Sequence, residues 1–431
     1  MAMPVQTQIT RHAIAARIAY IEFGSEFASL TAIARGGAVR WQSFHVDSVR
    51  SHRSHRRHSV QRQDIALAVA SLASGVALAQ SNVTIYGIAD MGYIYGSGDA
   101  GAGKSGSNTF SGVESGMQSG SRLGFKGSED LGNGLKASFT LEYALYLDQN
   151  SGIGNSGGPN ARQQFVALSS GKLGSVALGH QYAPGHDAST NNSPFGGSSH
   201  LSPQAILSSD AGNTITPASG SHWNNALAYT SPDFSGFTGK AVYGFGESSL
   251  GGYNNASTTD NGKFGLGGNY ANGPLNVDLV YQTRQRVNVA FPNPAGMGKD
   301  IDEGYIGASY DFKVVEVSGS YQAQNDKNIT CMDSATWTLG AVVAVMAASR
   351  IHFGYGRTDW NQGDNAATGM LNGRSEIYML GWSTSLSRRS SFYAGYLYVD
   401  NGQDSLGVSP SGVGAPGESN QTVLAGIRHT F

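Results

Sequence analysis

Two short segments match the spacing of catalytic motifs. Residues 98–105, GDAGAGKS, fit the pattern G-x-x-x-x-G-K-[ST], in which backbone amides and a lysine hold nucleotide phosphates. That pattern requires a helix directly after it, because the amides of the helix N-terminus bind the phosphates. The residues that follow, GSNTFSG, are poor helix formers. We therefore expect no nucleotide binding at this segment.

The remaining candidates for chemistry are equally weak. Residues 154–158, GNSGG, fit the G-x-S-x-G pattern but lie in a Gly-rich loop without a strand-to-helix turn. Cys331 is the only cysteine, which excludes an internal disulfide and a cysteine-based zinc cluster. No H-x-x-x-H spacing occurs among the histidines after residue 80, which are His180, His186, His200, His222, His352 and His429. We expect no metal, no cofactor and no catalytic residue.

Composition favours an all-β chain in two unequal parts. Of 431 residues, 13% are charged and 60 are Gly, a share that indicates many turns. The formal net charge of −2 gives no reason to expect nucleic acid as a partner. Charge nevertheless divides near residue 80, because residues 1–80 hold nine Arg, no Lys and only four acids. This division predicts a boundary at that point.

An uncharged run at residues 65–79, IALAVASLASGVALA, marks the boundary. A membrane-spanning helix needs about 20 apolar residues, so the run is short for an anchor and suits the apolar region of a secretory signal. We expect residues 64–80 to be that region, cleaved near Gln80; a buried helix is the alternative. Residues 1–63 are a basic leader, either disordered or a mis-assigned gene start, with metal or nucleic-acid binding as the weaker reading.

Apolar and polar residues alternate through the rest of the chain. Successive strand side chains point to opposite faces, so this pattern predicts strands with one apolar and one polar face. Sixteen segments show it, beginning with 83–95 and 122–126. In 135–147 every odd position is apolar: Leu135, Ala137, Phe139, Leu141, Tyr143, Leu145 and Leu147.

Long and short connections alternate between these segments. Eight long, Gly- and Ser-rich connections, including 96–120 and 183–221, face seven short turns such as 130–134. This arrangement predicts a 16-stranded antiparallel transmembrane β-barrel covering residues 81–431, since even strand numbers and unequal loops typify outer-membrane barrels. Lipid cannot hydrogen-bond the backbone, so strands there must close without an edge. A barrel of this size encloses an aqueous channel.

Several stretches resemble the trimeric general-diffusion porins of Gram-negative bacteria, most closely those of β-proteobacteria. They are SNVTIYGIADMGY from Ser81, SRLGFKGSEDLGNGLKASFTLEY from Ser121, RQQFVALSSGKLGSVALGHQY from Arg162, NNALAYTSPDFSGF from Asn224 and the terminal VLAGIRHTF. The resemblance implies a passive pore for small hydrophilic solutes and ions in the outer membrane. It also implies a homotrimer in contact with outer-membrane lipid and lipopolysaccharide, assembled by the barrel-assembly machinery, which would recognise Phe431.

In this family the third long loop folds into the barrel and narrows it opposite a ladder of basic residues. Here that loop is 183–221, and Pro194, Phe195, Gly196 and Gly197 resemble its tip. The resemblance places Arg122 and Arg162 on the ladder, and strand parity independently points Arg122 inward. His222 stands where the third rung is usually Arg.

The resemblance and strand parity also suggest how charge is divided at the waist. Lys136 lies on the inward face and joins the basic side. Glu142 matches a family carboxylate facing the constriction, and Asp187 and Asp210 are the acids of the third loop. These three residues form the expected acidic side. For the two loop acids, solvated carboxylates without a role are an equal alternative.

The expected function is passive diffusion driven by size and charge, with a weak preference for anions. A substrate-specific channel remains the alternative within the same class. An outer-membrane barrel hydrolase, with Ser198 and His200 as nominal catalytic residues, and a purely structural surface barrel are the alternatives in other classes.

Overall fold

The computed structural model describes residues 83–101, 107–150, 160–246, 261–287, 298–328, 332–360 and 372–431. The leader at 1–63, the apolar region at 64–80, the segment at 154–158 and Cys331 lie outside these residues, as does most of the GAGKS half of the motif at 98–105.

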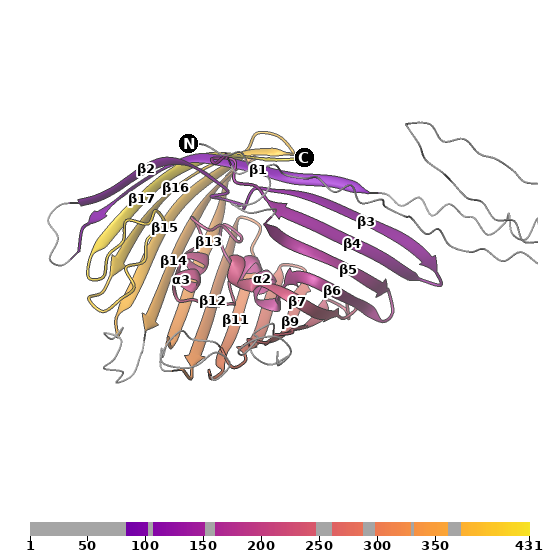
Figure 1. The fold of residues 1–431 in the computed structure, drawn as a ribbon. Helices are drawn as coiled ribbons and strands as arrows, with labels where there is room; N and C mark the ends of the chain where they lie inside the picture. The colour runs from indigo at the N-terminus through magenta and orange to yellow at the C-terminus, as the bar shows by residue number, and fades with distance from the viewer. Residues whose placement is uncertain are drawn as a thin grey trace, which may run out of the picture. The chain divides into compact units, whose positions relative to one another are not determined.

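Within these described ranges, seventeen strands form one antiparallel sheet that closes on itself, because β1 pairs with β17 (Figure 1). The strands are β1 (Thr84–Asp99), β2 (Ser107–Ser115), β3 (Arg122–Gly132), β4 (Leu135–Ala144), β5 (Ala161–Ser170), β6 (Gly174–Tyr182), β7 (His222–Thr230), β8 (Phe237–Gly244), β9 (Lys263–Asn272), β10 (Leu275–Arg284), β11 (Ile301–Asp311), β12 (Val315–Asp326), β13 (Ser334–Met346), β14 (Ser349–Trp360), β15 (Arg374–Ser385), β16 (Ser390–Asn401) and β17 (Ser419–Thr430).

The barrel wall has sixteen strand positions, because β2 and β3 occupy one position end to end. Along the same edge of β1, residues 91–99 pair with β2 and residues 84–88 pair with β3. The prediction of sixteen strands is therefore confirmed, but the expected long loop at 96–120 is wrong. Most of it forms the end of β1 and the whole of β2, and the chain leaves the sheet again only at 116–121.

A buried carboxylate holds that interruption in place. Asp90 on β1 is fully buried and accepts hydrogen bonds from the backbone N–H groups of Gln118 (3.1 Å) and Ser119 (2.6 Å). The Tyr393 hydroxyl on β16 donates to the other oxygen of Asp90 at 2.5 Å. Burying a carboxylate costs free energy unless its oxygens accept hydrogen bonds. These donors therefore fix the path of the chain between β2 and β3.

The alternation seen in the sequence separates the two faces of the wall. Large apolar side chains such as Leu279, Leu339 and Phe353 point outward and stay exposed, while Gln282 and Thr336 point inward and are buried. An apolar outer face and a polar inner face suit a barrel in lipid. Among the described residues no helix is long and apolar enough to cross a membrane.

The third long loop covers residues 183–221, as the sequence predicted. It holds α2 (Pro184–Asn191), α3 (Pro203–Asp210) and a 3₁₀ turn, η1 (Ser219–Ser221). Helix α2 contacts β6 and β8–β11, whereas α3 contacts β13–β15 (Figure 1). The Ser202 side chain accepts a hydrogen bond from the N–H of Ala205 and so caps α3. Pro203 is the first residue of the helix, where its missing N–H would have no partner within the helix.

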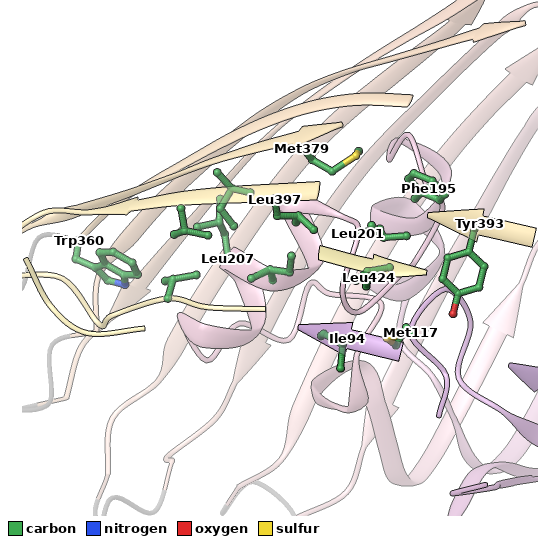
Figure 2. Close-up of a cluster of buried hydrophobic side chains, with 14 residues drawn as sticks. Ile94, Met117, Phe195, Leu201, Leu207, Trp360, Met379, Tyr393, Leu397 and Leu424 are labelled. Carbon is green, nitrogen blue, oxygen red and sulfur yellow. The ribbon is translucent and has the colours of Figure 1, made fainter. Parts of the chain in front are cut away.

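An apolar cluster attaches this loop to the inner wall. From the loop, Phe195, Leu201 and Leu207 meet inward side chains of β1 and β14–β17, together with Met117 from the interruption between β2 and β3 (Figure 2). The wall residues include Ile94, Trp360, Met379, Tyr393, Leu397 and Leu424. The barrel therefore contains a hydrophobic core, which fills the side of the lumen that these strands line.

Glycines on the inner wall make room for the loop. A Cβ on Gly381 would lie 2.2 Å from Cε2 of Phe195, and a Cβ on Gly395 would lie 2.2 Å from Cδ2 of Leu201. Pro203 similarly lies against Gly354, within 3.0 Å of its Cβ position. Strand glycine usually weakens a sheet or marks a close approach, and here the approach is that of the loop.

Replacing one of these glycines should loosen the loop. We expect Gly381→Val to lower the free energy of unfolding by about 1–3 kcal/mol, as overpacking in a core does. The measurement is urea-induced unfolding in lipid vesicles, followed by tryptophan fluorescence. The matched control is Gly304→Val on β11, where an added Cβ meets nothing within 4 Å. Equal losses in both variants would show that the contact with Phe195 does not matter.

Candidate functional site

Two arginines share one carboxylate on the inner wall. Arg122 begins β3, Arg162 lies near the start of β5, and Glu142 lies on β4 between them. Arg162 Nε is 3.1 Å and Arg122 Nη1 is 3.5 Å from Glu142 Oε1. Arg122 is fixed further because its Nε donates to the carbonyl of Gly120 at 2.8 Å. The structure brings these three predicted site residues together.

Two tyrosines complete the surroundings of Glu142. The Tyr86 hydroxyl donates to Oε2 at 3.0 Å, and the Tyr182 hydroxyl donates to Oε1 at 3.1 Å. The carboxylate is only 3% exposed. Its assignment to the acidic side of the waist is wrong, because β4 lies between the two arginine-bearing strands. Glu142 is instead the shared counter-ion of the arginines, and the group keeps one net positive charge.

His222 lies beside the arginines in a stack of aromatic rings. Tyr182 stacks on His186 with ring centroids 3.8 Å apart. The His222 ring is tilted relative to Tyr182, and their centroids are 4.7 Å apart. The guanidinium of Arg162 lies 5.9 Å from the centre of the Tyr182 ring. Burial lowers the pKa of the His186 imidazole. His222 is thus part of an aromatic cluster whose Tyr182 ring separates it from Arg162.

Asp187 on α2 pairs with a cation that the sequence analysis did not single out. Its carboxylate lies 3.0 Å from Lys240 Nζ on β8 and 3.2 Å from His186 Nδ1. Burial raises the pKa of this carboxyl, but the hydrogen bond from His186 and the charge of Lys240 together hold it below its usual range. Asp210 is exposed at the end of α3, on the part of the loop that contacts β13–β15. The two loop acids therefore do not form one acidic wall.

Lys136 does not reach the waist. It is exposed and follows the tight turn at Asn133 and Gly134 by two residues. Glu142 is six residues further along β4, which corresponds to about 20 Å. The assignment of Lys136 to the basic side of the constriction is wrong, because parity gives the face of a strand but not the height on it.

The expected loop tip is attached to β14. Phe195 stacks on the ring of His352 at 3.9 Å, and His352 Nδ1 lies 2.6 Å from the carbonyl oxygen of Pro194. Gly196 has φ of +56°, a conformation that favours glycine, and turns the chain after the stacked ring. Gly197 follows and lies against Pro217: a Cβ added to Gly197 would lie 2.7 Å from Cβ of Pro217.

Sequence reasoning missed the two acids that hold the loop. Glu303 on β11 is 1% exposed and accepts hydrogen bonds from the N–H groups of Thr214 (2.8 Å) and Ile215 (3.0 Å). Arg284 on β10 pairs with the same carboxylate at 3.1 Å. Asp278 on β10 accepts amide hydrogen bonds, including one from Asn192 at 2.8 Å. Their inward parity in alternating strands was the available signal.

Inward cations were missed as well. Arg428 on β17 donates to the Ser119 hydroxyl at 3.0 Å. Lys263 on β9 lies 5.8 Å above the ring of Trp223. With the arginines already described, the inner wall carries Arg122, Arg162, Lys240, Lys263, Arg284 and Arg428. Each occupies a polar position of an alternating strand, which parity alone could have identified.

The nominal hydrolase residues do not form a serine–histidine pair. Ser198 is fully buried and donates to the carbonyl oxygen of Met117 at 2.8 Å. His200 instead contacts the hydroxyl of the neighbouring Ser199 at 2.9 Å and the carboxylate of Glu114 at 3.0 Å. These bonds attach the loop to β2 and to the interruption that follows it.

The terminal residue extends the pairing of β1. Phe431 exchanges two backbone hydrogen bonds with Gly87, each of 3.1 Å, and its side chain is exposed. The barrel is therefore closed up to its last residue.

Comparison with known proteins identifies this barrel. Residues 66–404 match the family model for Gram-negative porins. The chain belongs to the Gram-negative porin family. Outer membrane porin protein 32 of Delftia acidovorans is 33% identical over 85% of this chain and 99% of its own length. An outer membrane porin protein of Bordetella pertussis is 29% identical over the same shares of both chains.

Solved structures agree with this assignment. The anion-selective porin from Comamonas acidovorans aligns with a TM-score of 0.65 and 27% identity, over 82% of this chain and 100% of that one. Salmonella typhi OmpF shares the fold with a TM-score of 0.60 and 16% identity, over 83% of this chain and 99% of that one. The protein is thus an outer-membrane porin, a water-filled β-barrel channel for passive diffusion.

The buried attachment of the loop gives a direct test of the constriction. We expect Glu303→Gln to destabilise the porin by about 3 kcal/mol, because it breaks a buried ion pair. The mean single-channel conductance should rise as the loop leaves the wall. The control is Glu316→Gln at the turn end of β12. Unchanged conductance and stability in Glu303→Gln would show that the other attachments hold the loop without Glu303.

Proposed function

We propose that this porin favours small anions. The observation that carries the proposal is the sharing of one buried carboxylate by Arg122 and Arg162, which leaves a net positive charge on the inner wall beside the loop. Lys263 and Arg428 add positive charge to the same wall, whereas Lys240 and Arg284 are paired with Asp187 and Glu303. Fixed charges on a narrow aqueous path attract counter-ions and raise their local concentration. The similarity to a porin that is described as anion-selective supports the same direction.

The mechanism requires positioning but no covalent step, so we propose a channel without enzymatic activity. The loop lies against β6, β8–β11 and β13–β15, so we place the solute path beside the arginine-bearing strands β3–β5. There the arginines, the aromatic cluster and Lys240 order water and orient dipoles. An apolar solute gains nothing from such water, whereas a small hydrated anion exchanges part of its shell for guanidinium contacts.

A substrate-specific channel is the second candidate. The row of cations from Lys263 and Arg284 to Arg162 and Arg122 favours it, because a directed track of charge suits one class of solute. Conductance that saturates at low concentration with one solute, but not with other anions of similar size, would separate this candidate from general diffusion.

Export and assembly form part of the proposal. Residues 64–80 act as the apolar region of a signal peptide cleaved near Gln80. The mature barrel from residue 81 onward assembles as a homotrimer. The barrel-assembly machinery reads Phe431, whose side chain is exposed beside β1. Outer-membrane lipid and lipopolysaccharide contact the apolar outer face.

Reversal potentials in asymmetric potassium chloride test the anion preference. We expect Arg122→Ala to move the reversal potential toward that of a cation-selective pore, because it removes one of two adjacent positive charges. Glu142→Gln should move the potential in the opposite direction, since the arginines lose their counter-ion.

Lys136→Ala serves as the control, because this lysine lies near the turn and should leave selectivity nearly unchanged. If Arg122→Ala and Lys136→Ala give the same reversal potential as the parent porin, the arginine pair does not line the narrowest part of the path.

A further inference from the structure

A second cationic group lies at the long-loop ends of β9 and β10, away from the arginine pair. Lys263 is the first residue of β9 and Arg284 is the last residue of β10, and the two are paired in register. Both side chains point inward. Their positions place two positive charges side by side on the inner wall.

The charge of this group is only half compensated. Arg284 is the register partner of Lys263, and the Glu303 carboxylate lies 3.1 Å from Arg284. Glu303 is already committed, because it pairs with Arg284 and accepts N–H groups of Thr214 and Ile215. Within the described residues, Lys263 has no hydrogen-bonded or ion-paired partner, and its ammonium lies over the ring of Trp223.

Acceptors are also missing around the same side chains. Among the described residues, Nε of Arg284 and the indole N–H of the fully buried Trp223 have no hydrogen-bond acceptor. The Trp223 ring reaches under β9, where its Cη2 lies 3.0 Å from the Cβ position of Gly265. Buried donors are normally satisfied, so a group with two cations and two unpaired donors lacks an acceptor-rich, negatively charged species.

We propose that Lys263 and Arg284 form a binding site for a small oxyanion, a carboxylate or phosphate group, on the path toward the arginine pair. Nη2 of Arg284 is bonded to Glu303 and Gln324, so Arg284 offers its unpaired Nε–H and Lys263 offers a point charge to an anion with several oxygens. Glu303 holds Arg284 in place and leaves Lys263 free for the ligand. The site rests on the proposed anion preference and specifies where anions pause.

The position of the site relative to the aromatic cluster gives it a role. The ammonium of Lys263 lies over the ring of Trp223, which directly follows His222 on β7. His222 in turn lies beside Tyr182 and Arg162. An oxyanion released from Lys263 therefore meets the aromatic cluster and then the arginine pair. Binding at successive weak sites permits passage, because each site holds the ion only briefly.

Single-channel conductance in increasing inorganic phosphate tests the site. The parent porin should show conductance that saturates. We expect Lys263→Met to raise the half-saturating phosphate concentration by about tenfold, the loss typical of one charge-assisted contact. Lys263→Arg keeps the charge and should retain saturation. Lys136→Met removes a lysine near the turn and should behave as the parent.

Two results would overturn the site: conductance of the parent porin that rises linearly with phosphate, or equal half-saturation in the parent and in Lys263→Met. Circular dichroism of each variant confirms that the barrel is folded. The reversal potential of the parent in potassium chloride tests the anion preference separately. A pore that is anion-selective there, but whose phosphate curve ignores Lys263, would remove this site and leave the proposed function intact.

Discussion

The attachment of the third loop to the inner wall determines the shape of the pore. A closed barrel of this size leaves a lumen too wide for strand side chains to fill, so its selectivity depends on what else occupies it. Glu303 solves part of this problem. Its buried carboxylate accepts two backbone N–H groups of the loop and pairs with Arg284. A buried carboxylate whose oxygens accept these bonds is stable in the interior, and the bonds fix Thr214 and Ile215 of the loop against β11.

The high glycine content has the same origin. Part of it serves turns, but Gly354, Gly381 and Gly395 lie inside strands, on the face that the loop covers. Side chains at these positions would occupy the space of Pro203, Phe195 and Leu201. Glycine is a poor strand former, but at these positions it lets the loop approach the wall. The side chains of the apolar cluster in Figure 2 then fill the space between loop and wall. The strand glycines and the path of the loop therefore depend on the same contact surface.

Sequence alternation predicted the architecture well and the site less well. The third loop was located between alternating segments that end at Tyr182 and resume at Ala226, whereas β7 begins at His222. Strand β2 was missed because SNTFSGVES has few large apolar residues and reads as loop; its strand character comes from pairing with β1. The assignments of Lys136 and Glu142 to the constriction were wrong for a different reason. Parity gives the side of a strand, whereas height along the barrel and the identity of neighbouring strands depend on register, which alternation does not specify.

The shared carboxylate explains how a barrel can keep two guanidinium groups close together. At an effective dielectric constant of 20, two like charges about 4 Å apart repel by about 4 kcal/mol. Glu142 and the hydroxyls of Tyr86 and Tyr182 hold the arginines in fixed positions while cancelling half of their charge. A fully compensated group would attract nothing, and an uncompensated one would bind anions too strongly to release them. One remaining positive charge, set in a rigid frame and facing water, meets the requirement that ions enter readily and leave quickly.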